Sequence, residues 1–322
     1  MKSHKNIVFI PGLLLLFLAT TGSALALTIS PVKVEVTGNP GQTLQGELTL
    51  LNEQKENKTF FSTFENFEPS GETGSPKFVG AKDGLATWIN TQASVDVATD
   101  ETIKVPYSIT IPNNAEPGGY FAAIFWGEQN PDTQAGGEVS IGGKIGVIIL
   151  LRVAGDIEEV AGISDFTTAD GKKFKTNLPV IFNYRFKNSG GDRVVPLGDI
   201  TIKNIFGFVA ATLPANSKEG SVLPDSARKF EVLWGESTNE DEVRSFFTTA
   251  KDQLKNFHVG PYKANLSLVY GATNQSATDD FWFFLFPWQL LLLATLGLLI
   301  LGIVLKLYNA WIISKSKSKS DV

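Results

Sequence analysis

The sequence predicts an all-β protein, with two tandem Ig-like antiparallel β-sandwiches followed by one C-terminal transmembrane α-helix. Three observations favour this fold class. Short runs of alternating apolar and polar residues are separated by turn residues about every 8–12 positions. The order of these runs recurs in the second half of the chain. One nearly unbroken apolar segment, from Leu290 to Leu305, lies close to the C-terminus.

Residues 1–26 have the pattern of a secretory signal peptide. Lys2 and Lys5 precede an apolar segment from Ile7 to Ala19, and the small residues that a signal peptidase needs follow at positions 24–26. We therefore expect cleavage after Ala26 and export of the part of the chain that follows.

Residues 27–155 are predicted to form the first sandwich. Its Gly-, Pro- and Ser-rich stretch Pro69–Asp83 is expected to be a long loop. The expected strands are Ile29–Val36, Leu44–Leu51, Thr59–Phe67, Ser94–Ala98, Ile103–Ile111, a strand at 117–126, and Val139–Val153.

Residues 156–280 are predicted to form the second sandwich, with a domain boundary between Ala154 and Gly162. The strand patterns at 179–188, 226–234 and 260–271 repeat those at 44–52, 103–111 and 119–127. This order predicts a tandem duplication of one fold. Helical spacing of apolar residues predicts one inserted helix near 240–257, with Thr238 or Asn239 as its N-cap.

Tyr120 and Tyr262 begin equivalent strands and are expected to form tyrosine corners, in which the hydroxyl returns to a nearby backbone group. Strand alternation then places Tyr120 on the core side and the phenylalanines Phe121 and Phe125 on the outer side. Such an apolar patch is covered either by the rest of the chain, through residues 69–83 or the second sandwich, or by a partner.

Residues 281–313 are predicted to be a transmembrane helix with aromatic flanks. At about 1.5 Å per residue, residues 285–305 span the roughly 30 Å hydrocarbon layer of a lipid bilayer. Lysines follow this segment in the tail 314–322 but do not immediately precede it. The positive-inside rule therefore predicts a single-pass cell-membrane protein with its N-terminal ectodomain outside and its C-terminus in the cytoplasm.

The composition excludes one class of partner and indicates a source. Residues 27–280 contain 22 Lys and Arg against 32 Asp and Glu, a net charge of −10. A nucleic-acid-binding protein shows the opposite balance, so no nucleic-acid partner is expected. The chain has no cysteine, which points either to a bacterial surface or to cores large enough to need no disulfides, rather than to a disulfide-rich animal ectodomain.

No motif for catalysis, cofactor binding or metal binding is recognisable, so we predict a protein that is not an enzyme and has no cofactor or metal. His258 is the only histidine after the signal peptide, and we expect it to be a packed or surface residue. Two alternatives stay open. Converging carboxylates would make a membrane-tethered hydrolase, and Asp96, Asp100 and Glu101 would make a calcium site.

Flat aromatic faces beside hydrogen-bonding side chains are typical of glycan-binding surfaces. The first sandwich gathers aromatic residues near its predicted long loop, with the amides of Asn90 and Gln92 just beyond. The competing prediction is that Trp88 closes one end of the sandwich. The candidate ligand-binding residues are Phe67, Phe78, Trp88, Phe121 and Phe125.

The sequence resembles the bacterial WxL-interacting cell-surface proteins. The resemblance depends on Ile29-Ser30-Pro31, on residues 39–43 leading into Leu44–Asn52, and on Ile109–Pro112 followed by residues 117–120. It covers residues 27–154, and the second domain by architecture only. It implies a first domain that binds peptidoglycan and a second that binds a host ligand.

The expected function is that of a membrane-anchored binding or scaffold protein of the cell envelope, contacting the lipid bilayer through 285–305 and a cell-wall glycan or another envelope protein. The alternative is a chaperone-like assembly module that accepts a partner strand at an exposed edge, predicted at Val139–Val153.

Overall fold

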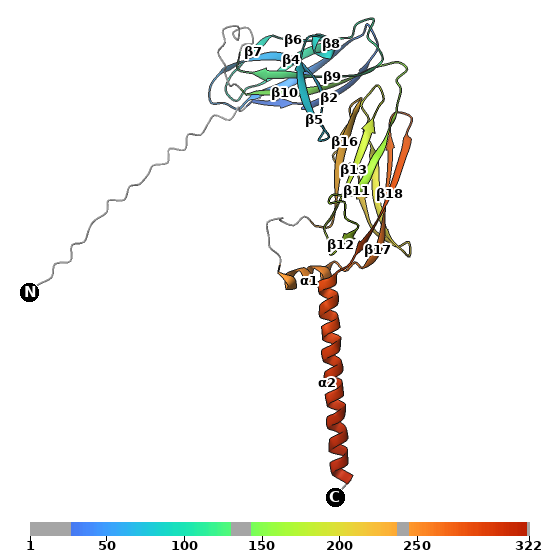
Figure 1. Ribbon diagram of the computed structural model, residues 1–322. Helices are drawn as coiled ribbons and strands as arrows, with labels where there is room; N and C mark the ends of the chain where they lie inside the picture. The colour runs from blue at the N-terminus through green and yellow to red at the C-terminus, as the bar shows by residue number, and fades with distance from the viewer. Residues whose placement is uncertain (1–26, 130–142, 237–244, 321–322) are drawn as a thin grey trace, which may run out of the picture.

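The computed structural model describes residues 27–129, 143–236 and 245–320, and side chains up to 313 (Figure 1). Two β-sandwiches follow one another and a single long apolar helix completes the chain, which confirms the predicted fold class. The predicted signal peptide, residues 1–26, lies outside the described residues.

The first sandwich packs a four-stranded sheet against a six-stranded one. The first sheet has the order β1 (Leu27–Ser30), β3 (Thr43–Asn52), β8 (Thr102–Thr110), β6 (Ile89–Thr91). The second has the order β2 (Lys33–Gly38), β10 (Lys144–Val153), β9 (Gly118–Gly127), β4 (Lys58–Ser70), β5 (Ser75–Gly80), and β7 (Ser94–Val97) also pairs with β4. A short 3-10 helix, Leu85–Thr87, precedes β6.

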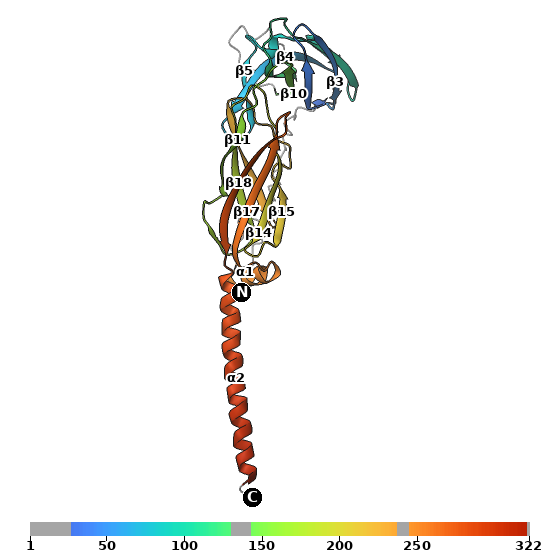
Figure 2. The same cartoon turned by 90° about the vertical axis from the view of Figure 1, so that its right-hand side faces the viewer.

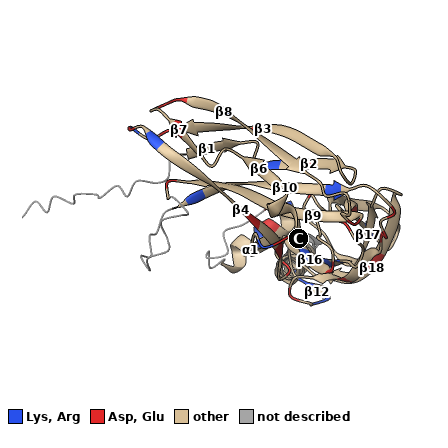
Figure 3. Cartoon of the chain, turned by 90° about the horizontal axis from the view of Figure 1, so that it is seen from above, with Lys and Arg blue, Asp and Glu red and all other residues tan. Residues whose placement is uncertain are grey.

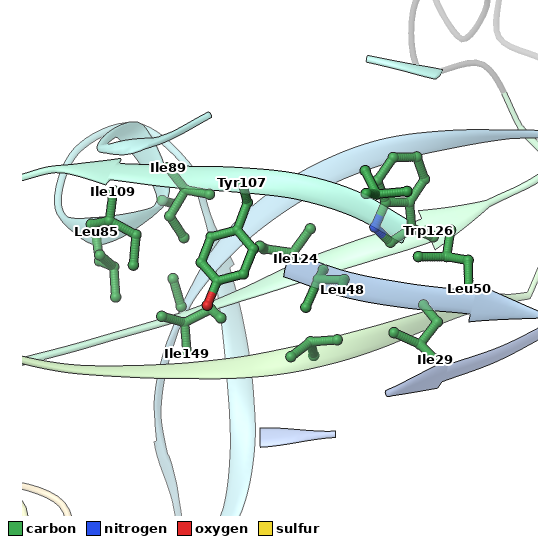
Figure 4. Packing of buried hydrophobic residues seen from close by; sticks show 14 of the residues in the cluster. Ile29, Leu48, Leu50, Leu85, Ile89, Tyr107, Ile109, Ile124, Trp126 and Ile149 are labelled. Carbon is green, nitrogen blue, oxygen red and sulfur yellow. The ribbon is translucent and has the colours of Figure 1, made fainter. Parts of the chain in front are cut away.

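The core of this sandwich follows the predicted strand alternation. In β9 the side chains of Ala122, Ile124 and Trp126 are buried between the sheets, and Tyr120 packs at the edge of the same cluster. Figure 4 shows Ile124 and Trp126 facing residues of the opposite sheet, including Leu48. The core side of β9 was therefore predicted correctly.

The predicted tyrosine corner at Tyr120 is present, because its hydroxyl donates to the carbonyl of Glu116 at 3.0 Å. This bond ties the start of β9 to the loop before it. Burial raises the pKa of Tyr262 and the backbone of Val259, three residues upstream, opposes this effect, so the corner at Tyr262 stays a prediction.

The predicted strand Ile29–Val36 is two strands in different sheets. Pro31 has no N–H and cannot continue the ladder between β1 and β3, so the chain crosses to the other sheet. There β2 pairs in parallel with β10, which makes the sandwich not wholly antiparallel. The prediction of an exposed edge at Val139–Val153 is also wrong for its described part, because β10 lies between β9 and β2.

The predicted long loop Pro69–Asp83 is largely a hairpin. Strand β4 continues to Ser70 and pairs with β5, with Phe67 opposite Phe78. Gly71 and Gly74 have positive φ, +56° and +76°, and this allows the tight turn between the strands. We call residues 67–80 the β4–β5 arm.

The second sandwich has its own core, between a three-stranded and a five-stranded sheet. The first has the order β11 (Ala161–Thr168), β13 (Val180–Asn188), β16 (Ser226–Trp234). The second has the order β12 (Phe174–Lys175), β18 (Gln275–Leu285), β17 (Gly260–Tyr270), β14 (Leu197–Asn204), β15 (Val209–Pro214). Here too one pair is parallel, β12 with β18.

Equivalent asparagines support the predicted internal repeat. Asn52 ends β3 and Asn188 ends β13, and both side chains are fully buried. Each donates to the carbonyl four residues further on, that of Glu56 at 3.0 Å and that of Asp192 at 2.7 Å. The same buried residue therefore fixes the same turn in both sandwiches.

The two predicted helices begin later than expected. Helix α1 is Phe246–Lys255 with Ser245 as N-cap, and the predicted caps Thr238 and Asn239 lie outside the described residues. Helix α2 is Trp288–Ser320, not a helix from 281, because Phe281–Leu285 belongs to β18. Its segment Trp288–Ile313 is long and apolar enough to cross a membrane, with a mean hydropathy of 2.6 over its most apolar window.

The first sandwich lies across the far end of the second, and α2 continues from the opposite end (Figures 1 and 2). Seen from above, basic and acidic residues are interspersed on the ribbon (Figure 3).

Candidate binding groove at the junction of the sandwiches

Polar contacts join the two sandwiches. Arg152 Nη1 lies 2.8 Å from Asp192 Oδ2, and Arg193 Nη2 lies 2.7 Å from Glu35 Oε2. The backbone N–H of Gly119 donates to the carbonyl of the second sandwich's Gly191 at 2.9 Å. Interfaces between neighbouring domains of one chain are typically polar, as this one is.

The β4–β5 arm adds a second set of contacts. At its tip, both carboxylate oxygens of Glu72 accept from Arg185 Nε at 2.9 Å. The Glu72 carbonyl accepts the backbone N–H of Lys229 at 2.8 Å. Lys229 lies in β16, an edge strand of its sheet, so a carbonyl in the turn of the arm accepts from the free side of this edge.

A groove of about 250 Å³ lies between the arm, β10 and the connection from β15 to β16. One wall is apolar and the rest carries three cationic side chains and one acidic side chain. We call this the junction groove. Its lining residues are Lys33, Phe67, Gly74, Pro76, Ile148, Leu150, Lys218, Glu219, Gly220, Ser221, Leu223 and Arg228.

Arg228 is the half-buried cation of the junction groove. Its Nη1 donates to the Ser221 carbonyl at 2.9 Å, and its guanidinium lies 5.3 Å from the centre of the Phe230 ring. A Cβ on Gly74 or Gly220 would lie 2.3 or 2.8 Å from its Cζ, so the guanidinium fills space that two glycines leave. Within the described ranges no carboxylate pairs with it.

Burial lowers the pKa of Arg228. Removal from water disfavours the charged form, and a cation in a protein interior is usually accompanied by a compensating anion. Among the described residues no carboxylate forms an ion pair with Arg228. A carboxylate entering the junction groove would find most of the five guanidinium donors unused.

A second pocket at the junction is lined by charged residues that pair with one another. It has a volume of about 460 Å³ and includes the paired residues Glu35 and Arg193. The backbone N–H of Ala272 is the main cause that lowers the pKa of Glu159, opposed by burial and aided by Thr273. Among the described residues its charged groups pair with one another or with backbone N–H groups, so these contacts help to hold the sandwiches together.

Four of the five predicted site residues lie together on the outer face of β4, β5 and β9. Phe67 is 6.0 Å from Phe78 and 5.9 Å from Phe121, and Phe78 is 4.9 Å from Phe125, measured between ring centres. Phe67 and Phe125 are only 8% exposed, and Phe78 is 37% exposed. The patch is thus covered by the β4–β5 arm, one of the two covers predicted within the chain.

Trp88 lies apart from the other four. It packs against the first core with its ring centre 4.6 Å from that of Tyr120, on the core side of β9. Of the five residues, only Phe67 lines the junction groove. A binding role for the five therefore remains a prediction, and they do not form one continuous surface.

Polar side chains line another groove, on the outer face of β3, β8 and β6. Its volume is about 460 Å³. The predicted amides Asn90 and Gln92 lie here, with Gln45, Thr91 and Ser108. This groove offers amide and hydroxyl groups, the partners that sugar hydroxyls need.

Three of the remaining candidates for chemistry make contacts within the chain. His258 lies between the rings of Trp234 and Tyr262, with centres 5.0 and 6.0 Å away. Asp96 accepts from Thr59, and Glu101 accepts from the backbone N–H of Ala98. In the part of the chain that the structure describes, no three His, Asp or Glu side chains are grouped to hold a metal ion.

Sequence reasoning missed Arg228 and Glu72. A signal for Arg228 was available, because alternation in β16 buries Phe230, Val232 and Trp234 and puts Arg228 on the same side. A charged residue at an inward position of a strand marks a special site. Glu72 had no such signal, because its partner is 113 residues away.

No family model and no curated protein matches the chain. Among solved structures it is similar to the class 5 fimbriae chaperone CfaA, at 10% identity and TM-score 0.40, covering 80% of this chain and 98% of that one. It is also similar to the CsuC–CsuE chaperone–adhesion subunit complex of Acinetobacter baumannii, at 10% identity and TM-score 0.36, covering 79% and 97%. A third is the CupB2 chaperone of Pseudomonas aeruginosa, at 10% identity and TM-score 0.34, covering 80% and 100%. These likenesses are too distant to establish a family or a function, so the resemblance to WxL-interacting proteins stays a prediction.

Proposed function

We propose that the chain is a non-enzymatic, single-pass membrane-anchored binding protein of the cell envelope, and that its junction groove takes an acidic, extended segment of a partner protein. The observation that carries the proposal is Arg228, a half-buried cation beside an apolar wall with no carboxylate partner among the described residues.

The anchor follows from α2. Its apolar segment exceeds the length that the hydrocarbon layer requires, and none of it is buried against the sandwiches. Lysines at positions 315, 317 and 319 favour a cytoplasmic C-terminus and an outside ectodomain.

A protein segment fits the groove better than a small ligand does. Arg228 of β16, an edge strand of its sheet, lines the groove, and the Glu72 carbonyl in the turn of the arm already accepts a backbone N–H from that edge. Added strands gain affinity from main-chain hydrogen bonds and specificity from side-chain pockets. Here Leu150 and Leu223 supply an apolar pocket and Arg228 an anion site.

The test measures binding of fluorescent extended peptides to the detergent-solubilised full chain by anisotropy. Acidic peptides are expected to bind and basic peptides of equal length are not. Arg228→Gln removes a charge-assisted hydrogen bond of about 1.5–3 kcal/mol, so affinity should fall roughly 10- to 100-fold. Lys229→Gln, one residue along the same strand but outside the groove lining, is the matched control and should bind as wild type does. Equal binding by Arg228→Gln and wild type contradicts the proposal.

A wall glycan is the second candidate ligand, at the polar groove of the first sandwich. The observation that favours it is that Asn90 and Gln92, predicted from sequence, line that groove beside Gln45 and Ser108. The double variant Asn90→Ala, Gln92→Ala should reduce co-sedimentation with purified peptidoglycan without lowering the melting temperature. Retention of full binding by this variant excludes the groove. The variant Phe78→Ala tests the aromatic candidates in parallel. Phe78 is the most exposed of the four candidate phenylalanines on the outer face.

A further inference from the structure

The exposed phenylalanines of the protein gather at one end of the second sandwich. Eight phenylalanines in the described part of the chain are more than a third exposed, and all but Phe78 belong to this end. The most exposed are Phe206 at 77%, and Phe174, Phe208 and Phe247 at 71% each. The other three are Phe257, Phe284 and Phe286.

Strand register shows that these residues share one end. Phe174 pairs with Phe284, which lies next to the last residue of β18. Asn204, the last residue of β14, pairs with Tyr262 near the start of β17. The turn 205–208, which carries Phe206 and Phe208, therefore projects beyond the sheet towards the start of α2 (Figures 1 and 2).

Helix α1 lies across the first turn of α2 at a steep angle (Figure 1). Gln253 holds it there: its Nε2 donates to Gln289 Oε1 at 2.6 Å and its Oε1 accepts the Leu290 N–H at 3.0 Å. Phe246 packs 5.6 Å from Trp288, between ring centres. These contacts fix α1 at the level where the apolar segment of α2 begins.

The exposed side of α1 carries large apolar residues together with lysines. Phe247 and Leu254, seven positions apart and therefore on one face, are 71% and 65% exposed, and Lys251 and Lys255 lie beside them. A helix with exposed large apolar residues flanked by lysines is typical of one that lies in the membrane interface, where lysine heads reach the lipid phosphates. In the segments 170–175 and 246–255 there are five lysines and two aspartates.

We propose that this end of the second sandwich, formed by α1, the turn 205–208 and the paired residues Phe174 and Phe284, is a membrane-surface contact that rests on the outer leaflet of the bilayer that α2 crosses. The inference rests on the proposed membrane anchor. Continuity with α2 identifies the occupant, because the surface begins where the apolar segment begins. Its consequence is a fixed orientation of the ectodomain relative to the membrane.

The absence of cysteine allows a direct test with the full chain in vesicles of phosphatidylcholine and phosphatidylglycerol. Single cysteines at Phe206 and Phe247 carry an environment-sensitive fluorophore, and spin-labelled lipids quench it from shallow or deep acyl positions. Both probes should be quenched by the shallow label. A probe at Phe78, an exposed phenylalanine of the first sandwich, is the matched control and should not be quenched.

A fourth probe, at Leu299 in the middle of α2, separates the two proposals. If Leu299 is not quenched by the deep label, the membrane anchor fails. If Leu299 is quenched while the probes at Phe206 and Phe247 behave as at Phe78, the anchor stands and the surface contact is overturned. Blue-shifted emission at Phe206 and Phe247 without lipid quenching also overturns it, since another protein surface, such as a second copy, would then cover this end.

Discussion

Replacing Phe283 by Ala should destabilise the second sandwich strongly, because this residue belongs to its core and not to the membrane span. Phe283 is 0% exposed, and its ring centre lies 5.4 Å from Phe182, 5.9 Å from Tyr262 and 6.0 Å from Trp234. Buried Phe→Ala changes cost about 3–5 kcal/mol, and rigid aromatic neighbours that cannot collapse place this one near about 4 kcal/mol.

The expected loss can be converted to a melting temperature. At roughly 2.1 cal/mol/K per residue over about 125 residues, a loss of about 4 kcal/mol lowers the Tm of the second sandwich by about 15 °C. The assay is circular dichroism of the detergent-solubilised full chain on heating, where the sheet signal is followed separately from the helix. Phe284→Ala, the adjacent residue on the exposed side, is the control.

Phe284 is 40% exposed and stacks on Phe174 at 5.2 Å between ring centres. Its replacement should cost about 1 kcal/mol or less and lower the Tm by only a few degrees. Equal small shifts for both variants would show that residues 281–285 are not part of the sandwich, and the assignment of β18 would then be wrong.

Two further predictions depend on single contacts, and a third depends on the lysines of the C-terminal tail. Tyr120→Phe removes the hydroxyl that closes the first tyrosine corner and should cost about 1 kcal/mol in urea unfolding, with unchanged strand content; no loss would make this bond irrelevant to stability. The pKa of Glu159 is lowered mainly by the hydrogen bond from the Ala272 N–H. The contribution of the ionised Glu159 to the free energy of unfolding is therefore present above the unfolded pKa of 4.5 and is lost as pH falls through the lower folded pKa. Glu159→Gln should therefore be less stable than wild type at neutral pH and equal to it in acid, and a difference independent of pH would refute this. A cysteine at Ser70 should react with an impermeant thiol reagent on intact cells while one at Ser318 should not, and the reverse labelling would invert the topology.

The core of each sandwich could be predicted because a strand has a period of two. In β9 this period alone separated Ala122, Ile124 and Trp126 from Phe121 and Phe125. The tyrosine corner at Tyr120 could also be predicted from local sequence, since its hydroxyl bonds to a group only four residues away. Contacts between residues that are close in the sequence can therefore be predicted from the local pattern.

Pairing between distant segments left no such signature. The parallel pairing of β2 with β10 joins residues more than 100 positions apart. The sequence of Lys33–Gly38 does not indicate which strand it pairs with. The glycines and prolines of the β4–β5 arm predict a loop, because the same residues suit an irregular loop and the turn of a hairpin. The start of α2 was misplaced for another reason: residues 281–286 are apolar on both faces, so hydropathy does not distinguish a strand from the first turns of a helix.

The junction groove is indicated by one residue, Arg228, that departs from the apolar pattern of the inward positions of β16. Trp88 and the four phenylalanines obey the rules of packing, and most of their surface is used by the chain itself. Arg228 violates the alternation of β16, and its guanidinium is left facing the junction groove. A charged residue at an inward position of a strand therefore indicates a candidate site in this protein.

The height of the junction groove above the membrane limits which partner can reach it. Strands β17 and β18 each have 11 residues and run from the α2 end to the junction end of the second sandwich. At about 3.3 Å per residue they place the junction roughly 35 Å from the start of α2. If the α2 end rests on the outer leaflet, this height is fixed. A partner that is an integral membrane protein must then carry its acidic segment on an ectodomain or linker at least that long, whereas a short loop between two membrane helices cannot reach Arg228. Shortening the linker of a candidate partner below that span should abolish its cross-linking to the groove.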